Sequence, residues 1–166
     1  VFRAIEKSGF NVVSPDNFKM LEHKLNSPEI ENAFFFLDSS KVWIPANKWL
    51  KILGMFDFFI ATPGVKMPHA HNVIEAMSLN VIPIIEYVEW FSPKLMHLHN
   101  CIHFDNKEEL ISRINQVLSM SNENIIRMRN NVFDYFKIKD EKIKRQILEA
   151  IGKNISSNLA QANKQV

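Results

Sequence analysis

Side chains that can bind an anion gather around Pro68. Lys66 lies before this proline, and His69 and His71 follow it. Proline is favoured as the first residue of a helix, because it has no N–H group to leave unbonded and its φ angle already suits a helix. The free backbone N–H groups of the residues after it, together with the positive end of the helix dipole, attract negative charge. The pattern therefore predicts a phosphate or diphosphate site at a helix start.

Glu75 is the acidic residue of the same predicted helix. At helical spacing it shares one face with His71 and Ser78. Another face carries an apolar stripe formed by Ala70, Val73, Ile74 and Met77. A carboxylate at this distance from a phosphate site is suitably placed to accept hydrogen bonds from sugar hydroxyls. The alternative is a solvated helix glutamate, which is the usual environment of this residue type.

Two buried strands are expected to hold this helix in place. Residues 58–61 and 81–85 are apolar runs of strand-forming residues on either side of it. An apolar strand, an amphipathic helix and a second apolar strand are typical of the βαβ unit of a parallel sheet. Ligands of such sheets bind outside the carboxyl ends of the strands, which here means the loop at residues 62–67. Asn80 should end the helix in a left-handed conformation, for which Asn is the common substitute for Gly.

The rest of the chain continues the alternation of strands and helices. Further strands are expected at residues 10–13, 33–37 and 101–104. Further helices are expected at residues 2–8, 17–25, 46–54, 123–136 and 140–153, with one more that begins at a cap formed by Asp105 and Glu108. This order predicts an α/β fold in which an open parallel sheet of about five strands has helices on both faces. We expect one domain over residues 1–155 and a polar tail at residues 156–166.

Two segments of the chain resemble a known family. The first combines a strand, a Pro-Gly loop, a helix with the letters I-E-A-M at residues 74–77, and the letters I-P-I-I at residues 82–85. The second, at residues 99–120, is similar to the pattern N-G-x-L-x-x-x-x-D-x-x-x-L-x-x-x-I-x-x-L-L. In this order and spacing the segments resemble the Rossmann-like, nucleotide-sugar-binding half of GT-B glycosyltransferases of the group 1 type. They cover roughly half of the chain.

The resemblance implies roles for particular residues. In the family the helix start contacts the donor diphosphate, which carries over to His71 and Asn72, and Gly64, Lys66 and His69 are further candidates for the diphosphate because they lie at the predicted anion site. The family's E-A-M glutamate contacts the donor ribose, which carries over to Glu75. The connection after the preceding strand often lies against the nucleotide base, so Trp43 and Ile44 are candidates for that contact, with simple packing of Trp43 as the alternative. Many retaining members have an acidic residue where this chain has Met67, so neither retaining nor inverting chemistry is assigned.

The implied activity is transfer of a sugar from a nucleotide-diphosphate sugar to a glycan or lipid-linked acceptor in glycan or surface-polysaccharide synthesis. No catalytic residue is assigned, because the base that activates the acceptor normally comes from a second domain. We expect an N-terminal Rossmann-like domain or a partner subunit to complete the enzyme. The alternative is a non-catalytic nucleotide- or phosphosugar-binding module. A third interpretation, a flavodoxin- or response-regulator-like signalling domain, lacks the expected acidic cluster after the first strand.

Composition narrows the class of ligand and compartment. The 166 residues have a net charge of +2, which favours an anionic ligand or a membrane surface and does not indicate nucleic acid. The single cysteine, Cys101, excludes an internal disulfide and fits a reducing compartment, and its apolar strand indicates a buried, inert thiol. We therefore expect a cytoplasmic protein, with peripheral association at the inner face of the membrane as an extension of that expectation. The six histidines lack the spacing of a zinc site, and the resembling family commonly works without a metal, so neither a metal nor another cofactor is expected.

Overall fold

The fold is built on two small parallel sheets. The computed structural model describes residues 2–63 and 71–162. β1 (Val12–Val13) pairs with β2 (Phe34–Phe35) in the smaller sheet. β3 (Phe58–Ala61), β4 (Ile82–Ile85) and β5 (Ile102–His103) form the larger sheet, in which β4 is the central strand and all pairs are parallel.

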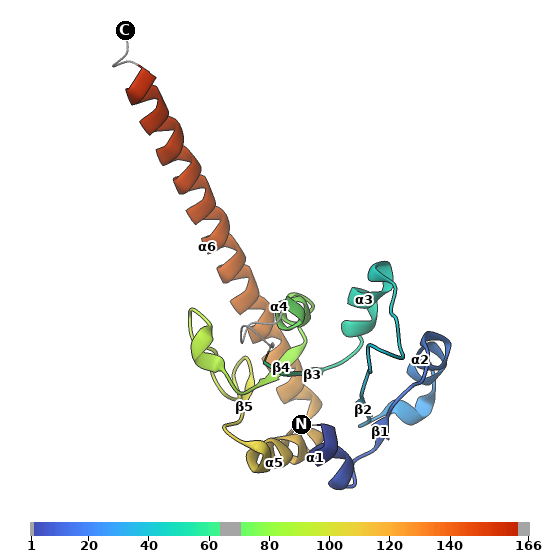
Figure 1. The fold of residues 1–166 in the computed structure, drawn as a ribbon. Coiled ribbons are helices and arrows are strands. Elements are labelled where there is room, and N and C mark those ends of the chain that lie inside the picture. Colours follow the sequence, from blue (N-terminus) through green and yellow to red (C-terminus); the bar gives the residue numbers. More distant parts are fainter. Residues whose placement is uncertain (1, 64–70, 163–166) are drawn as a thin grey trace.

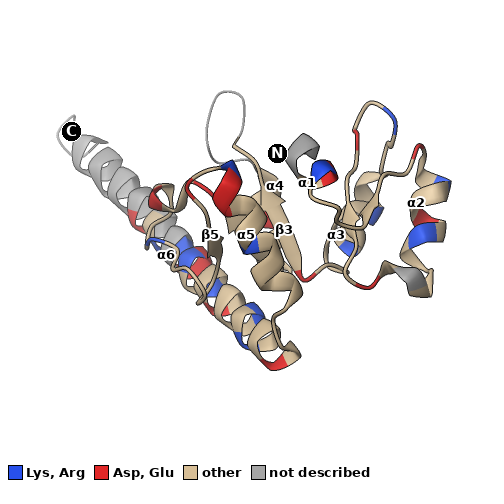
Figure 2. Ribbon diagram, turned by 90° about the horizontal axis from the view of Figure 1, so that it is seen from below, with Lys and Arg blue, Asp and Glu red and all other residues tan. Residues whose placement is uncertain are grey.

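Helices cover the larger sheet on two sides. The α-helices are α1 (Phe2–Lys7), α2 (Phe18–Leu25), α3 (Ala46–Leu53), α4 (His71–Ser78), α5 (Lys107–Leu118) and α6 (Asn122–Ala162). Two short 3₁₀ turns, η1 (Pro28–Ile30) and η2 (Val88–Trp90), lie between them. Figures 1 and 2 show α4 on one side of the three-stranded sheet and α1 and α5 on the other. The predicted α/β class is confirmed.

The central strand β4 forms the middle of the core. All four of its side chains are buried. Since β3 and β5 flank it and helices cover the sheet, side chains on both of its faces are excluded from water, as is typical of a parallel sheet. The predicted strands at residues 58–61 and 81–85 agree with β3 and with β4 to within one residue. Asn80 has a φ of +63°, which confirms the predicted left-handed end of α4.

The prediction of one open sheet of about five strands is not confirmed. Ladder hydrogen bonds join the strands only within the sheet of two and the sheet of three. Aromatic packing connects the two sheets instead. The ring centre of Phe35 in β2 lies 5.3 Å from the ring centre of Phe56, which comes two residues before β3. Val12 and Phe34 also pack against the same apolar cluster as Phe58 and Ile84. The two sheets therefore share a core without sharing a continuous hydrogen-bonded ladder.

The C-terminal part of the chain forms one helix of 41 residues, α6. The prediction of two helices, at residues 123–136 and 140–153, is wrong, because α6 continues through residues 137–139. The helix also passes through the first part of the predicted polar tail at residues 156–166. Figure 1 shows α6 beside the sheets near its start and extending away from the rest of the fold toward its C-terminal end.

Both local and long-range contacts explain why α6 is continuous. None of the residues 137–139 is a helix breaker, and Lys144 forms an ion pair with Asp140 at the i,i+4 spacing that supports a helix. Met128 and Val132 are buried in the main core, and the hydroxyl of Tyr135 donates a hydrogen bond to the carbonyl oxygen of Pro93. Within residues 2–63 and 71–162, no helix combines the length and apolar character that a membrane span requires.

Candidate functional site

The candidate site lies where β3 ends and α4 begins. Ala61, the last residue of β3, is buried, and His71 is the exposed first residue of α4. Gly64, Lys66 and His69, three of the five predicted diphosphate ligands, lie outside the described residues. The order of strand, loop and helix nevertheless places the start of α4 at the carboxyl edge of the parallel sheet, which is the edge where such folds bind ligands.

Glu75, the predicted ribose ligand, is held by a tryptophan. Its Oε2 atom accepts a hydrogen bond of 2.7 Å from the indole Nε1–H of Trp49, and both side chains are partly buried. Trp49 lies on α3 and Glu75 on α4, so this bond joins two neighbouring helices. The indole itself packs against an apolar cluster of Leu53, Ala76 and Val81. Sequence reasoning did not identify this bond, because a partner 26 residues from Glu75 leaves no spacing signal.

Asn72 brings a second polar group to α4. Its Oδ1 atom is buried and has no hydrogen-bond partner among the described residues. A buried acceptor without a donor costs roughly 1–3 kcal/mol. The carboxamide can present its oxygen to a hydroxyl group or, after a half turn, its NH₂ group to a phosphate oxygen. The predicted role of Asn72 in binding the diphosphate stays a prediction.

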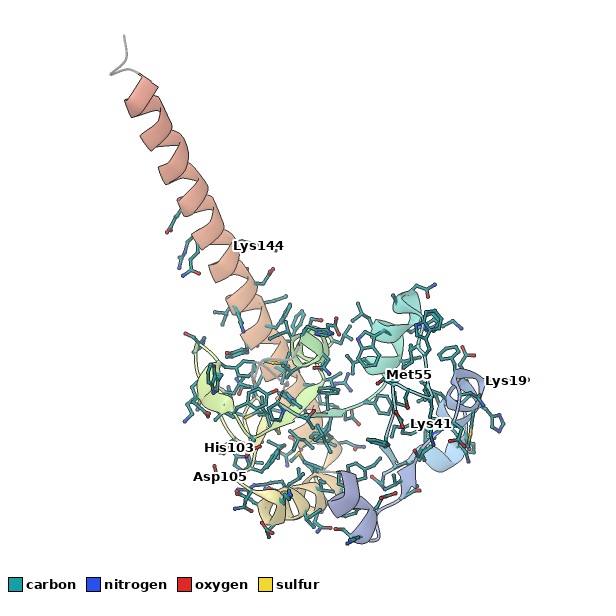
Figure 3. All side chains as sticks on the ribbon, in the orientation of Figure 1. Lys19, Lys41, Met55, His103, Asp105 and Lys144 are labelled. Carbon is teal, nitrogen blue, oxygen red and sulfur yellow. The ribbon has the colours of Figure 1, made fainter. Side chains whose placement is uncertain are left out.

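The loop after β2 supplies polar groups. Asp38 folds the loop, because its Oδ1 atom accepts hydrogen bonds from the backbone N–H (2.9 Å) and the hydroxyl (2.7 Å) of Ser40. These bonds from Ser40 stabilise the carboxylate and hold the pKa of Asp38 below its usual value. Lys41, labelled in Figure 3, forms an exposed ion pair with Asp16, with 3.3 Å between Nζ and Oδ1.

The two base-contact candidates differ in exposure. The side chain of Trp43 is 75% exposed, which leaves the indole free to stack on a ligand. Ile44 is partly buried and packs against a cluster that includes Val42 and Ile52. The loop that carries Trp43 leads directly into α3, which begins at Ala46, contacts α4 and carries the Trp49 that donates a hydrogen bond to Glu75. The loop after β2 and the start of α4 are thus connected through α3.

A shallow hollow at the ends of β4 and β5 was not predicted as a site. Glu86, Asp105 and Glu108 line it with Lys107 and with the start of α5. One of the free N–H groups of this helix start is already bonded, since the Glu109 N–H donates to Asn106 Oδ1 (2.9 Å), and the N–H of Asp105, just before the cap, donates to Glu109 Oε2 (2.8 Å). The cap is therefore formed by Asn106 and Glu109, and the prediction that Asp105 and Glu108 form it is wrong by one residue. The acidic lining of the hollow does not favour a phosphate.

His97 and His103 hold the segment around β5. His97 Nδ1 accepts a hydrogen bond of 3.0 Å from the backbone N–H of His103. His103 Nε2 lies 3.2 Å from the carbonyl oxygen of Glu86 and 3.5 Å from Asp105 Oδ1 (Figure 3). Among the residues that the structure describes, no three His, Cys, Asp or Glu side chains are grouped closely enough to hold a metal ion.

Cys101 is buried next to β5, as its apolar sequence context indicates. Burial disfavours the thiolate and raises the pKa of this thiol to about 12. The cysteine is therefore neutral at physiological pH and is not a nucleophile.

His97 should make the stability of the fold depend on pH. Burial, followed by the positive charge of Arg113, holds the pKa of His97 below its usual 6.5 in the folded chain. The unfolded chain therefore binds a proton at a higher pH than the folded chain does, so stability should fall as the pH drops below about 6.5. Protonation would also remove the Nδ1 acceptor used by His103. We expect urea denaturation at pH 7.5 and pH 5.5 to show this loss.

A matched pair of variants isolates that contribution. His97→Asn can place an amide oxygen where Nδ1 accepts its hydrogen bond, but it cannot be protonated, so it should lose less stability between the two pH values than the unchanged chain. His23→Asn, which alters an exposed histidine on α2 away from the bond between His97 and His103, is the control variant. An equal loss of stability in His97→Asn and in the unchanged chain would contradict the role of His97.

Comparison of the chain with protein-family models, with curated proteins and with solved structures gives no match.

Proposed function

We propose that this chain is the donor-binding domain of a GT-B-like glycosyltransferase, which binds a nucleotide-diphosphate sugar whose sugar is transferred to an acceptor. The observation that carries the proposal is the Glu75 carboxylate on α4, which is partly buried and is fixed by Trp49 one turn after the helix start. Among the described residues no cation is paired with this carboxylate. A partly buried carboxylate with free acceptor positions is suited to bind the hydroxyl groups of a ribose.

The start of α4 supports the diphosphate part of the proposal. The N–H groups of the first turn of a helix have no partners within the helix, and the helix dipole adds positive potential there. His71, exposed at this end, can add a side-chain donor. Departure of a nucleoside diphosphate builds negative charge on its oxygens, so fixed donors at this position stabilise the transition state more than the ground state.

The acceptor and its base require groups that we do not assign to the described residues. In this proposal the acceptor glycan or lipid is bound by a second Rossmann-like domain or by a partner subunit, which also supplies the general base. This chain supplies the donor site, with Trp43 as the candidate for stacking on the nucleotide base.

Calorimetric titration of the purified chain with UDP, GDP, ADP and CMP tests the proposal. We expect one nucleoside diphosphate to bind and Glu75→Ala to weaken its binding by roughly ten- to a hundredfold, because hydrogen bonds to a charged acceptor contribute about 1.5–3 kcal/mol. Glu89→Ala is the matched control, since Glu89 is an exposed glutamate on η2. Absence of binding by the folded chain, or unchanged affinity in Glu75→Ala, would contradict the proposal.

A further inference from the structure

The hydrogen bond between Trp49 and Glu75 has features that a simple link between two helices does not require. It joins α3 to α4 over 26 residues of sequence, and the distance from Nε1 to Oε2 is 2.7 Å. The indole has a single N–H donor and no acceptor, so it can bind only one lone pair of the carboxylate. An arginine in the same place would occupy both oxygens and neutralise the charge. The indole orients the carboxylate without pairing it with a cation.

Trp49 is itself held in place by packing. Its ring lies against an apolar cluster of Leu53, Ala76 and Val81, with Phe59 and Leu79 also in contact with that cluster. Ala76 follows Glu75 directly on α4, so the cluster fixes the indole relative to the same helix turn that carries the carboxylate. A donor on a rigid, packed ring fixes its partner more firmly than a donor on a long, mobile side chain.

The acceptor positions that the indole leaves on Glu75 limit which ligand donors the carboxylate can bind. With Oε2 committed to the indole on one side, the remaining lone pairs, chiefly those of Oε1, are available to donors from a ligand. Two adjacent hydroxyl groups, as in the 2′,3′-diol of ribose, can donate to one fixed carboxylate. A 2′-deoxyribose has one donor fewer and would leave an acceptor position unbonded.

We infer that Trp49 is a positioning residue that orients Glu75 so that the site selects ribonucleotides over 2′-deoxyribonucleotides. This inference rests on the proposed function. It extends that function by assigning sugar discrimination to a pair of residues on α3 and α4. Trp49 acts through the carboxylate and does not contact the ligand itself.

Binding measurements on matched nucleotides test the inference. The probes are the ribo and 2′-deoxy forms of the nucleoside diphosphate that binds, titrated into the unchanged chain, Trp49→Phe, Glu75→Ala and Trp90→Phe. We expect the unchanged chain and Trp90→Phe, which alters an exposed ring on η2, to prefer the ribo form at least tenfold. Trp49→Phe keeps an aromatic ring in the cluster but lacks the N–H donor, so its preference should fall to less than about threefold, while inorganic pyrophosphate binds it as before.

The outcomes separate this inference from the function on which it rests. If no nucleoside diphosphate binds the folded unchanged chain, the proposed function fails and the inference fails with it. If the nucleotide binds and Glu75→Ala loses the ribo preference but Trp49→Phe keeps it, the function stands and the inference is overturned. The double variant Trp49→Phe/Glu75→Ala should show the same ratio of ribo to 2′-deoxy affinity as Glu75→Ala alone, because Trp49 acts only through Glu75.

A measurement on the unchanged side chains covers the case in which Trp49→Phe does not fold. The chain has three tryptophans, so ¹⁵N labelling gives three indole N–H signals, and Trp43→Phe and Trp90→Phe identify those of Trp43 and Trp90. The Trp49 signal should shift more on addition of the ribo form than of the 2′-deoxy form at saturation. Equal shifts with the two forms would overturn the inference.

Discussion

Replacing Ile84 with alanine should lower the free energy of unfolding by about 2–5 kcal/mol, the range observed when a large buried aliphatic side chain is truncated. Ile84 is fully buried in the central strand β4, where it lies opposite Ile60 of β3 and Ile102 of β5. Truncation removes apolar contacts on a strand that has neighbours on both sides, so the cavity cannot collapse without moving the sheet. Urea denaturation monitored by circular dichroism measures the change.

Ile126→Ala is the matched control for this variant. Its side chain is 59% exposed on α6, and alanine has a higher helix propensity than isoleucine. We therefore expect a change within about 0.5 kcal/mol, which is usual for surface substitutions. A loss of less than about 1 kcal/mol in Ile84→Ala would contradict a core centred on β4.

Replacing Ile138 with proline should destabilise the chain by about 3 kcal/mol or more, because proline lacks the N–H of the helical hydrogen bond and its ring clashes with the carbonyl four residues earlier. The side chain of Ile138 is 61% exposed, so its loss removes little packing. The neighbouring Lys139 places its Nζ 5.0 Å from the centre of the Phe91 ring, and this contact should weaken as the helix bends. Urea denaturation and far-ultraviolet circular dichroism measure stability and helix content.

This variant decides between one helix and two. Ile138→Ala keeps the backbone donor and should leave both stability and helix content nearly unchanged. If the helix were interrupted between residues 136 and 140, as the sequence predicted, proline at position 138 would fall between two helices and have little effect. An unchanged far-ultraviolet spectrum in Ile138→Pro would therefore contradict the continuity of α6.

Much of the larger sheet could be predicted from local patterns. The run at residues 58–61 is β3, and the run at residues 81–85 contains β4, because fully buried parallel strands must be apolar on both faces. Asn80 was identifiable because the left-handed conformation favours few residue types. The cap of α5 was misplaced by one residue, since Asp105 and Asn106 are both good capping residues and the pattern alone does not choose between them.

The remaining features depend on contacts between distant parts of the chain. β2 and β3 are joined by the packing of Phe35 on Phe56 and not by a strand ladder, and no spacing in the sequence reports that arrangement. The continuity of α6 depends partly on the anchoring of Tyr135 to Pro93 across 42 residues. The bond from Trp49 to Glu75 likewise forms only when α3 and α4 come together. For these features the sequence supplies suitable residues, and tertiary packing selects the partners.

The position of the ligand is the most direct test of the central claim that the site lies at the start of α4. The measurement is a titration of the ¹⁵N-labelled chain with the nucleoside diphosphate that binds, in which the NMR chemical shifts of the backbone amides are recorded at each step. We predict the largest shifts at residues 71–75 and 38–44, where α4 begins and where the loop after β2 carries Trp43. Shifts confined to the hollow lined by Glu86, Asp105 and Glu108, or no shift at saturating nucleotide, would contradict the account.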